Sequence, residues 1–242
     1  MTSESIDNQF QYQIQTLEIE NNQLKQEIHQ LKNQLQTIQE SLSKCMKKED
    51  VIQLIQMEYL KRKKSHTLGM TPTQMDIINE WTGLQINEVV FDSKKDNWTK
   101  DSSVFNEKIF GKKQLTFLIE DKYGQKFGYY LNTSIDQNGG KADEKSFHFN
   151  LDSKGRLSSP MKFEIRKAKF CGYGLYEHSA DRLIDIGDIR LYKQHQKSQS
   201  FCVQTNYYFN YHGIENALCG KEYSIHCSDC FIPQRIIVIQ MK

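Results

Sequence analysis

Residues 10–42 carry the sequence FQYQIQTLEIENNQLKQEIHQLKNQLQTIQESL, in which apolar side chains recur at alternating spacings of four and three residues. This repeat is typical of a coiled coil, because it lays one narrow apolar seam along a helix. A single helix cannot bury such a seam, so we expect a second helix to cover it. The simplest arrangement is a homodimer.

The heptad register indicates how the two helices pair. Asn21 falls at an a position of the seam. Glu20 at g precedes Lys25 at the following e position, and the same pairing recurs one heptad later. A polar Asn at a and opposite charges at g and e favour a parallel, in-register dimer. The predicted dimer interface consists of Ile14, Leu17, Asn21, Leu24, Ile28, Leu31, Leu35, Ile38 and Leu42.

An amphipathic helix folded back onto its own globular domain is the alternative to a coiled coil. Such a helix usually presents a wider apolar face, whereas the e and g positions here are polar. We therefore predict the parallel coiled coil.

Length and charge bound what the rest of the chain can be. The 242 residues leave room for one ordinary globular domain, and the mixed charges, with a net charge of +2, give no strongly basic surface for nucleic acid. No apolar run approaches the roughly 20 residues of a membrane span, and the first residues are polar and acidic rather than signal-peptide-like. We expect a cytoplasmic protein without membrane insertion, whose six cysteines are reduced.

The heptads end after Cys45, and the composition then divides the chain into three parts. Residues 1–60 form the predicted coiled-coil and helical oligomerisation segment. Residues 61–70 form a basic polar linker that opens with the run KRKK at 61–64, which is either a solvated helix end or a targeting signal. Residues 71–242 form the predicted globular domain.

Helix and strand signals follow one another closely in the globular domain. Thr71-Pro72 is a typical helix start, and Gly83 is placed to end that helix. The apolar runs at 115–119 and 236–239 show no polar alternation, so we expect strands buried on both faces, the second of them central in its sheet.

Other strands of the globular domain show clear alternation. Between residues 147 and 151, apolar side chains alternate with His148 and Asn150, which predicts a half-buried strand with His148 on its solvated face. Short strands separated by turn residues favour an α+β, mainly β, fold. The prediction is a two-sheet antiparallel β-sandwich with a few short helices, preceded by the long coiled-coil helix.

The sequence contains none of the common catalytic signatures. It lacks the glycine-rich phosphate loop, the Gly-x-Ser-x-Gly elbow and the His-Glu-x-x-His zinc helix. We therefore predict no catalytic residues and no cofactor.

The strongest candidate for metal or redox chemistry is Cys227-Ser228-Asp229-Cys230. Two thiolates at this spacing suit tetrahedral zinc, and Cys219 or His212 could complete the ligand set. A single Cys-x-x-Cys without a second pair is a weak zinc signal, so we predict no metal site. A thiol-dependent antioxidant or zinc-binding protein that uses Cys227 and Cys230 stays open as the alternative function.

An ordered set of segments in the second half of the chain resembles a known family. The segments are QKFGYY at 125–130, FCGYGLY at 170–176, CVQT at 202–205, YHGIENALCG at 211–220 and the final strand at 231–240. Their order is similar to that of the TLDc domain, the C-terminal module of the oxidation-resistance family, over about residues 71–242. Gly128 and Gly172 match family glycines, whose physical use is close backbone approach or special dihedral angles.

The resemblance implies a noncatalytic binding domain linked to oxidative-stress resistance. Several TLDc proteins bind the peripheral sector of the vacuolar proton-pumping ATPase, so the resemblance implies that partner here. The chain departs from the family at Gln240-Met241-Lys242, where members often have an acidic residue and Trp, and in an apparent insertion at 223–230. Both departures lie near the C-terminal strand, which puts the ATPase as partner in doubt.

Overall fold

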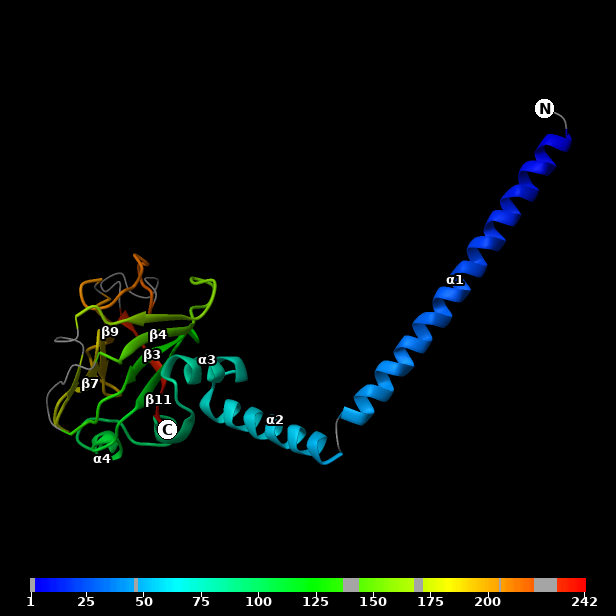
Figure 1. Ribbon diagram of the computed structural model, residues 1–242. Coiled ribbons are helices and arrows are strands. Elements are labelled where there is room, and N and C mark those ends of the chain that lie inside the picture. The colour runs from blue at the N-terminus through cyan, green and yellow to red at the C-terminus, as the bar shows by residue number, and fades with distance from the viewer. Residues whose placement is uncertain (1–2, 46–47, 137–143, 168–171, 205, 220–229) are drawn as a thin grey trace. The chain divides into compact units, whose positions relative to one another are not determined.

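The computed structural model describes residues 3–45, 48–136, 144–167, 172–204, 206–219 and 230–242, and the chain divides into two compact units, Met1–Lys63 and Lys64–Lys242. The first unit is helical, with α1 (Ser3–Cys45) and most of α2 (Lys48–Leu68) (Figure 1). Helix α2 runs through residues 61–68, where we expected a polar linker. Its last turn belongs to the second unit, in which Leu68 is only 1% exposed.

The second unit contains two antiparallel sheets and two further helices, α3 (Pro72–Thr82) and α4 (Phe105–Ile109) (Figure 1). The larger sheet has the strand order β1 (Ile86–Asp92), β11 (Pro233–Met241), β2 (Leu115–Asp121), β3 (Lys126–Leu131), β4 (Phe147–Asp152) and β5 (Met161–Glu164). The smaller sheet has the order β10 (Cys230–Phe231), β9 (Ser200–Cys202), β8 (Ile189–Tyr192), β7 (Arg182–Ile186) and β6 (Tyr173–Leu175). The described part of the chain thus has the predicted α+β class with two antiparallel sheets.

Two hydrophobic cores cover the two faces of the larger sheet. One core lies between the sheets and joins Phe117 and Phe127 of the larger sheet to Ile184 of the smaller one. The other packs Met75 and Ile78 of α3 against the opposite face of the larger sheet. The second unit is therefore built in three layers: helix α3, the larger sheet and the smaller sheet. The larger sheet lies in the middle, and most of both its faces is buried.

Local sequence signals account for helix α3 and for strand β11. The Thr71 side chain accepts a hydrogen bond from the backbone N–H of Gln74, whose side chain bonds back to Thr71, so a complete capping box begins α3. Gly83 ends the helix in the left-handed conformation, as predicted. The β-branched run at 236–239 lies in β11, which pairs with β1 and β2 and is fully buried there, so the prediction of an interior strand is confirmed.

The prediction of a half-buried strand at 147–151 with a solvated His148 is wrong. His148 is completely buried, and Asn150 is 1% exposed. The Asn150 side-chain amide donates to the carbonyl oxygens of Ala217 and Leu218 at 3.0 Å. The alternation of β4 separates two buried faces, one toward α3 and one toward the smaller sheet, rather than core from solvent.

A buried ion pair ties the end of α2 to the larger sheet. Arg235 on β11 contacts the Asp92 carboxylate at 2.7 Å and also donates to the backbone carbonyl of Thr67 at 2.8 Å. Burial alone would raise the pKa of the Asp92 carboxyl, but the hydrogen bonds from Arg235 and the Lys94 backbone, together with the positive charges of Arg235 and Lys95, outweigh burial and hold the pKa below its ordinary value. The pair is charged at neutral pH and fixes where the helix meets the sheet.

Candidate functional site

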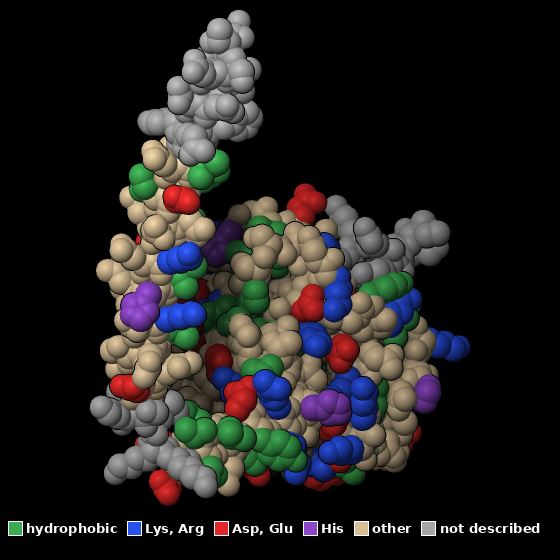
Figure 2. Space-filling model, turned by 90° about the vertical axis from the view of Figure 1, so that its right-hand side faces the viewer, with side chains coloured by type: hydrophobic (Ala, Val, Ile, Leu, Met, Phe, Trp, Pro, Cys, Tyr) green, Lys and Arg blue, Asp and Glu red, His purple; other side chains and the backbone are tan. Residues whose placement is uncertain are grey.

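The predicted dimer seam on α1 is exposed wherever the structure describes its side chains. Its apolar members are 48% to 63% exposed. Figure 2 shows apolar side chains as green patches at intervals along the helix. They are Ile14, Leu17, Leu24, Ile28, Leu31, Leu35 and Ile38, with Asn21 exposed among them. The Leu42 side chain lies outside the described residues. A narrow row of large apolar side chains is the pattern by which a coiled-coil seam is predicted.

Helix α2 carries a second exposed apolar surface of a different shape. Seven large apolar side chains between Val51 and Leu60 are 37% to 67% exposed. They do not follow one stripe but occur on most sides of the helix. A helix that is apolar on most sides requires more cover than one partner helix provides.

The cysteine cluster differs from the expected set of reduced thiols. Cys202 and Cys219 are fully buried and form no disulfide, but Cys230 is disulfide-bonded, so the expectation of a reduced thiol is wrong at this position. Cys227 lies outside the described residues. Among the residues that the structure does describe, no group of three His, Cys, Asp or Glu side chains could hold a metal ion.

A buried polar network joins the two sheets through His148. The backbone N–H of Asp188 donates to His148 Nε2 at 2.8 Å, and His148 Nδ1 lies 3.2 Å from the carbonyl oxygen of Gly128. Since Nε2 accepts, Nδ1 carries the proton. The Tyr211 hydroxyl donates to the Asp188 carboxylate at 3.0 Å. Burial lowers the pKa of His148 to about 3, so the ring is neutral and its role is to hold the sheets together.

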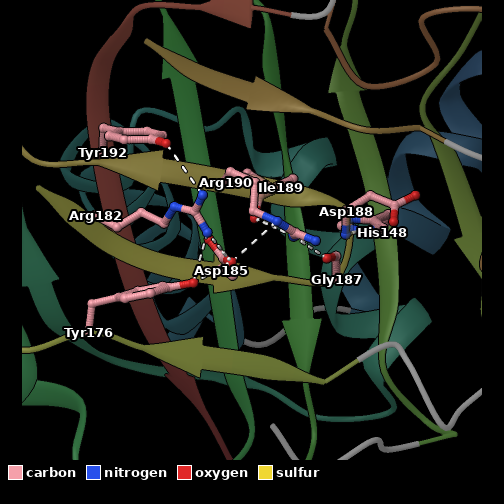
Figure 3. Close-up of polar contacts among 9 residues, drawn as sticks. All are labelled: His148, Tyr176, Arg182, Asp185, Gly187, Asp188, Ile189, Arg190 and Tyr192. Atoms are coloured by element: carbon pink, nitrogen blue, oxygen red, sulfur yellow. Dashed lines mark hydrogen bonds and ion pairs between the residues drawn. The ribbon is translucent and has the colours of Figure 1, made fainter. Parts of the chain in front are cut away.

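The outer face of the smaller sheet carries a cluster of arginine and tyrosine side chains around Asp185 (Figure 3). Three donors reach one Asp185 oxygen, Oδ2. They are the Tyr176 hydroxyl at 2.7 Å, Arg182 Nη1 at 3.0 Å and Arg190 Nε at 3.3 Å. The strands set this geometry, because Asp185 on β7 is directly paired with Arg190 on β8.

Two tyrosine rings hold the Arg182 guanidinium from either side (Figure 3). Its carbon lies 5.3 Å from the ring centre of Tyr176 and 5.5 Å from that of Tyr192, within cation–π range. Burial raises the pKa of the Tyr176 hydroxyl, and its hydrogen bond to Asp185 raises it further. At neutral pH the cluster therefore carries two positive charges and one negative charge.

A polar groove with a volume of about 450 Å³ adjoins the cluster at Tyr192, which lines it. The loop from β8 to β9 forms one side, and Trp98 and the segment from Phe231 to Gln234 form the others. Lys193 anchors the loop, because its ammonium group donates to the carbonyl oxygens of Glu177 and His178 at 2.9 and 2.6 Å. Where the structure describes the lining, it contains four glutamines and no carboxylate.

Sequence reasoning found the α1 seam but not the arginine cluster or the groove. Arg182, Asp185 and Arg190 come from two strands, and their meeting depends on the register across the bend at Gly187 and Asp188. In the sequence, the apolar spacing of two residues slips to three around Gly187, between Ile186 and Ile189, and this slip is a local signal of the hairpin. His212, offered as a zinc ligand, is exposed and packs its ring 6.5 Å from that of Phe163.

Comparison with known proteins gives no family assignment for this chain. No family model matches it, and no curated protein matches it. Within the described residues, no helix has the length and hydropathy needed to cross a membrane.

Proposed function

We propose that this chain is a noncatalytic, cytoplasmic binding module of the TLDc type, which a parallel coiled coil pairs into a homodimer. The seam on α1 carries this proposal, because its described apolar side chains are half or more exposed at nearly every position. A second α1 helix in register would bury the whole row and would place Asn21 opposite its counterpart.

The globular unit supports the binding role through its architecture. Its two antiparallel sheets and few helices agree with the sandwich that the strand pattern predicts. The buried polar groups His148, Asp188 and Tyr211 are engaged with one another across the sheets. These buried groups stabilise the fold. We therefore propose that the unit binds its partner through its surface.

The dimer is tested by sedimentation equilibrium of the full chain and of a peptide of residues 1–60 at micromolar concentration. The proposal expects both to be dimers. The full chain in which Leu24, Leu31 and Leu35 are replaced by Ser should be monomeric with an unchanged content of β-structure. A monomeric wild-type peptide would refute the coiled coil.

The partner proposed from the resemblance is the peripheral sector of the vacuolar proton-pumping ATPase. Tagged full-length protein should retain purified peripheral sector on a resin in a stable complex, without consuming any substrate. Capture of a different assembly instead would leave the binding module standing and would remove only this partner.

The thiol-dependent alternative draws on one observation, the disulfide at Cys230. A dithiol peroxidase would cycle between this disulfide and its reduced form while it consumes peroxide and a thiol reductant. Peroxide consumption by the purified protein, abolished by Cys230→Ser or Cys227→Ser but not by Cys202→Ser, would establish that function. The binding proposal expects none of the three variants to differ in peroxide consumption from a buffer control.

A further inference from the structure

We infer that the outer face of β7 and β8, together with the adjoining groove, is the surface that binds a partner, and that it takes a carboxylate-bearing, extended segment of a protein. The face is built around Arg182 and Arg190, and the groove begins at Tyr192. This inference rests on the proposed function and names the surface and partner chemistry of the same binding unit.

The first support is the way Asp185 holds two guanidinium groups side by side. Arg182 Nη1 and Arg190 Nε both contact the same Asp185 oxygen, at 3.0 and 3.3 Å. Figure 3 shows Asp185 between the two arginines. One carboxylate cannot neutralise two guanidinium groups, so the cluster keeps one net positive charge. Asp181, the acidic residue next to Arg182 in the chain, is itself paired with Lys100 at 2.9 Å.

The second support is the set of N–H donors that the cluster leaves unused. Arg190 donates through Nη1 to the carbonyl oxygens of Gly187 and Ile189, and through Nε it pairs with Asp185. Within the described part of the chain, neither Arg190 Nη2 nor Arg182 Nε has a partner. The Arg182 and Arg190 side chains are 33% and 25% exposed. Guanidinium N–H groups in this state match carboxylate oxygens.

The third support is that both arginines are already ordered. Arg182 lies between two tyrosine rings and bonds both hydroxyls, at 2.8 Å to Tyr176 and 3.4 Å to Tyr192. A free arginine side chain loses about 2 kcal/mol of rotamer entropy when it is fixed, and here that loss has occurred on folding. Arginine and tyrosine are also the residues most enriched where protein interfaces gain their affinity.

The fourth support is the chemistry of the groove that continues from Tyr192. Its lining holds Lys197 and His195 on the exposed loop, and none of the described lining residues is acidic. Glutamine side chains such as Gln194 and Gln234 offer both donors and acceptors, which suit the amide groups of an extended peptide. A carboxylate on the arginines and the adjoining backbone in the groove would therefore be held by one continuous surface.

The test uses the full-length protein and fluorescence anisotropy of a labelled peptide in which Glu alternates with Leu. The same peptide with Gln in place of Glu is the ligand control. Wild-type protein should bind the Glu peptide and not the Gln peptide. Binding should weaken as ionic strength rises from about 0.01 to about 0.15 M, because the Debye length falls from about 30 to about 8 Å.

The variant that tests the surface is the pair Arg182→Ala and Arg190→Ala, which should raise Kd by about tenfold or more. Arg62→Ala with Lys63→Ala removes the same charge from α2 and should leave Kd unchanged, because both side chains are exposed outside the proposed surface. If the alanine pair unfolds, Arg182→Lys with Arg190→Lys decides the matter. This pair keeps the charge but loses the guanidinium forks, so Kd should still rise.

Three kinds of result would contradict the inference. An arginine variant that stays folded and binds as tightly as wild type would exclude this surface while leaving the binding module intact. Equal affinity for the Gln peptide, or binding only when the peptide is phosphorylated, would exclude carboxylate recognition. Absence of any peptide binding by wild type would exclude the inference as a whole, and the capture experiment with the ATPase sector tests the proposed function separately.

Discussion

At the scale of single residues, Gly128 on β3 has no space for a side chain. A Cβ atom there would lie 1.9 Å from the carbonyl oxygen of Phe117 and 2.7 Å from the ring of Phe149. The first contact is with the backbone of a central strand, which cannot move without breaking the sheet. We expect Gly128→Ala to lower the free energy of unfolding by about 3 kcal/mol, measured by urea denaturation.

Gly174→Ala is the matched control for this substitution. The nearest atoms to its Cβ would be at 3.6 Å, an ordinary van der Waals distance, so the free energy of unfolding should change by less than about 0.5 kcal/mol. Equal stability of the two variants would mean that β2 and β3 do not approach each other as described.

His148 predicts how stability depends on pH. Its folded pKa of about 3 lies below the value of 6.5 for an unperturbed ring, so between these values the unfolded chain binds a proton that the folded chain does not. Stability should therefore fall on acidification below pH 6.5, by about 1.4 kcal/mol per pH unit from this group alone.

The measurement is urea denaturation at several pH values between about 7 and 5, above the range in which the carboxyl groups titrate. His148→Phe keeps an aromatic ring but cannot accept the Asp188 N–H, so it should be less stable at pH 7 and show a flatter pH dependence. An unchanged slope in this variant would mean that other groups cause the acid sensitivity.

At the scale of elements, the orientation of the coiled coil can be decided at Cys45. This residue continues the heptad ladder at a d position. In a parallel, in-register dimer the two Cys45 thiols face each other at the distance that a disulfide needs. Mild oxidation should therefore give an interchain disulfide that non-reducing electrophoresis detects and that Cys45→Ser abolishes. A proven dimer that does not crosslink at Cys45 would indicate antiparallel helices.

The elements also show where sequence reasoning succeeds and where it fails. Helix α3 and strand β11 were predictable because their signals are local, a capping box at Thr71 and an uninterrupted β-branched run at 236–239. Strand β4 was misjudged because alternation distinguishes two faces without showing what covers them, and only the tertiary structure shows that the side of the smaller sheet covers the face with His148. The arginine cluster was not predictable, because its residues meet through the β7–β8 register.

At the scale of the whole molecule, the globular unit should fold without the helical unit and without metal. Its two hydrophobic cores contain no residue before Leu68, and the buried pair of Arg235 and Asp92 lies entirely within it. A chain of residues 64–242 should show one cooperative thermal transition that a chelator leaves unchanged. Stoichiometric zinc in this chain, with the transition lost on chelation, would instead establish the cysteine cluster as a structural metal site.

Two copies of the globular unit on one coiled coil should bind a repeated partner far more tightly than one copy does. Once the first unit is bound, the second meets a neighbouring site at a raised effective concentration, and avidity gains of about 100-fold or more follow when both sites are within reach. Replacing Leu24, Leu31 and Leu35 with Ser should therefore greatly weaken capture on a surface that carries many copies of the Glu–Leu peptide. The same replacement should leave the affinity for one peptide free in solution unchanged, because α1 lies outside the globular unit.

Biosensor capture and solution anisotropy measured on the same preparations separate the two effects. Equal losses in both assays would show that the helix takes part in the contact itself, and no loss in either would show that pairing contributes nothing to binding.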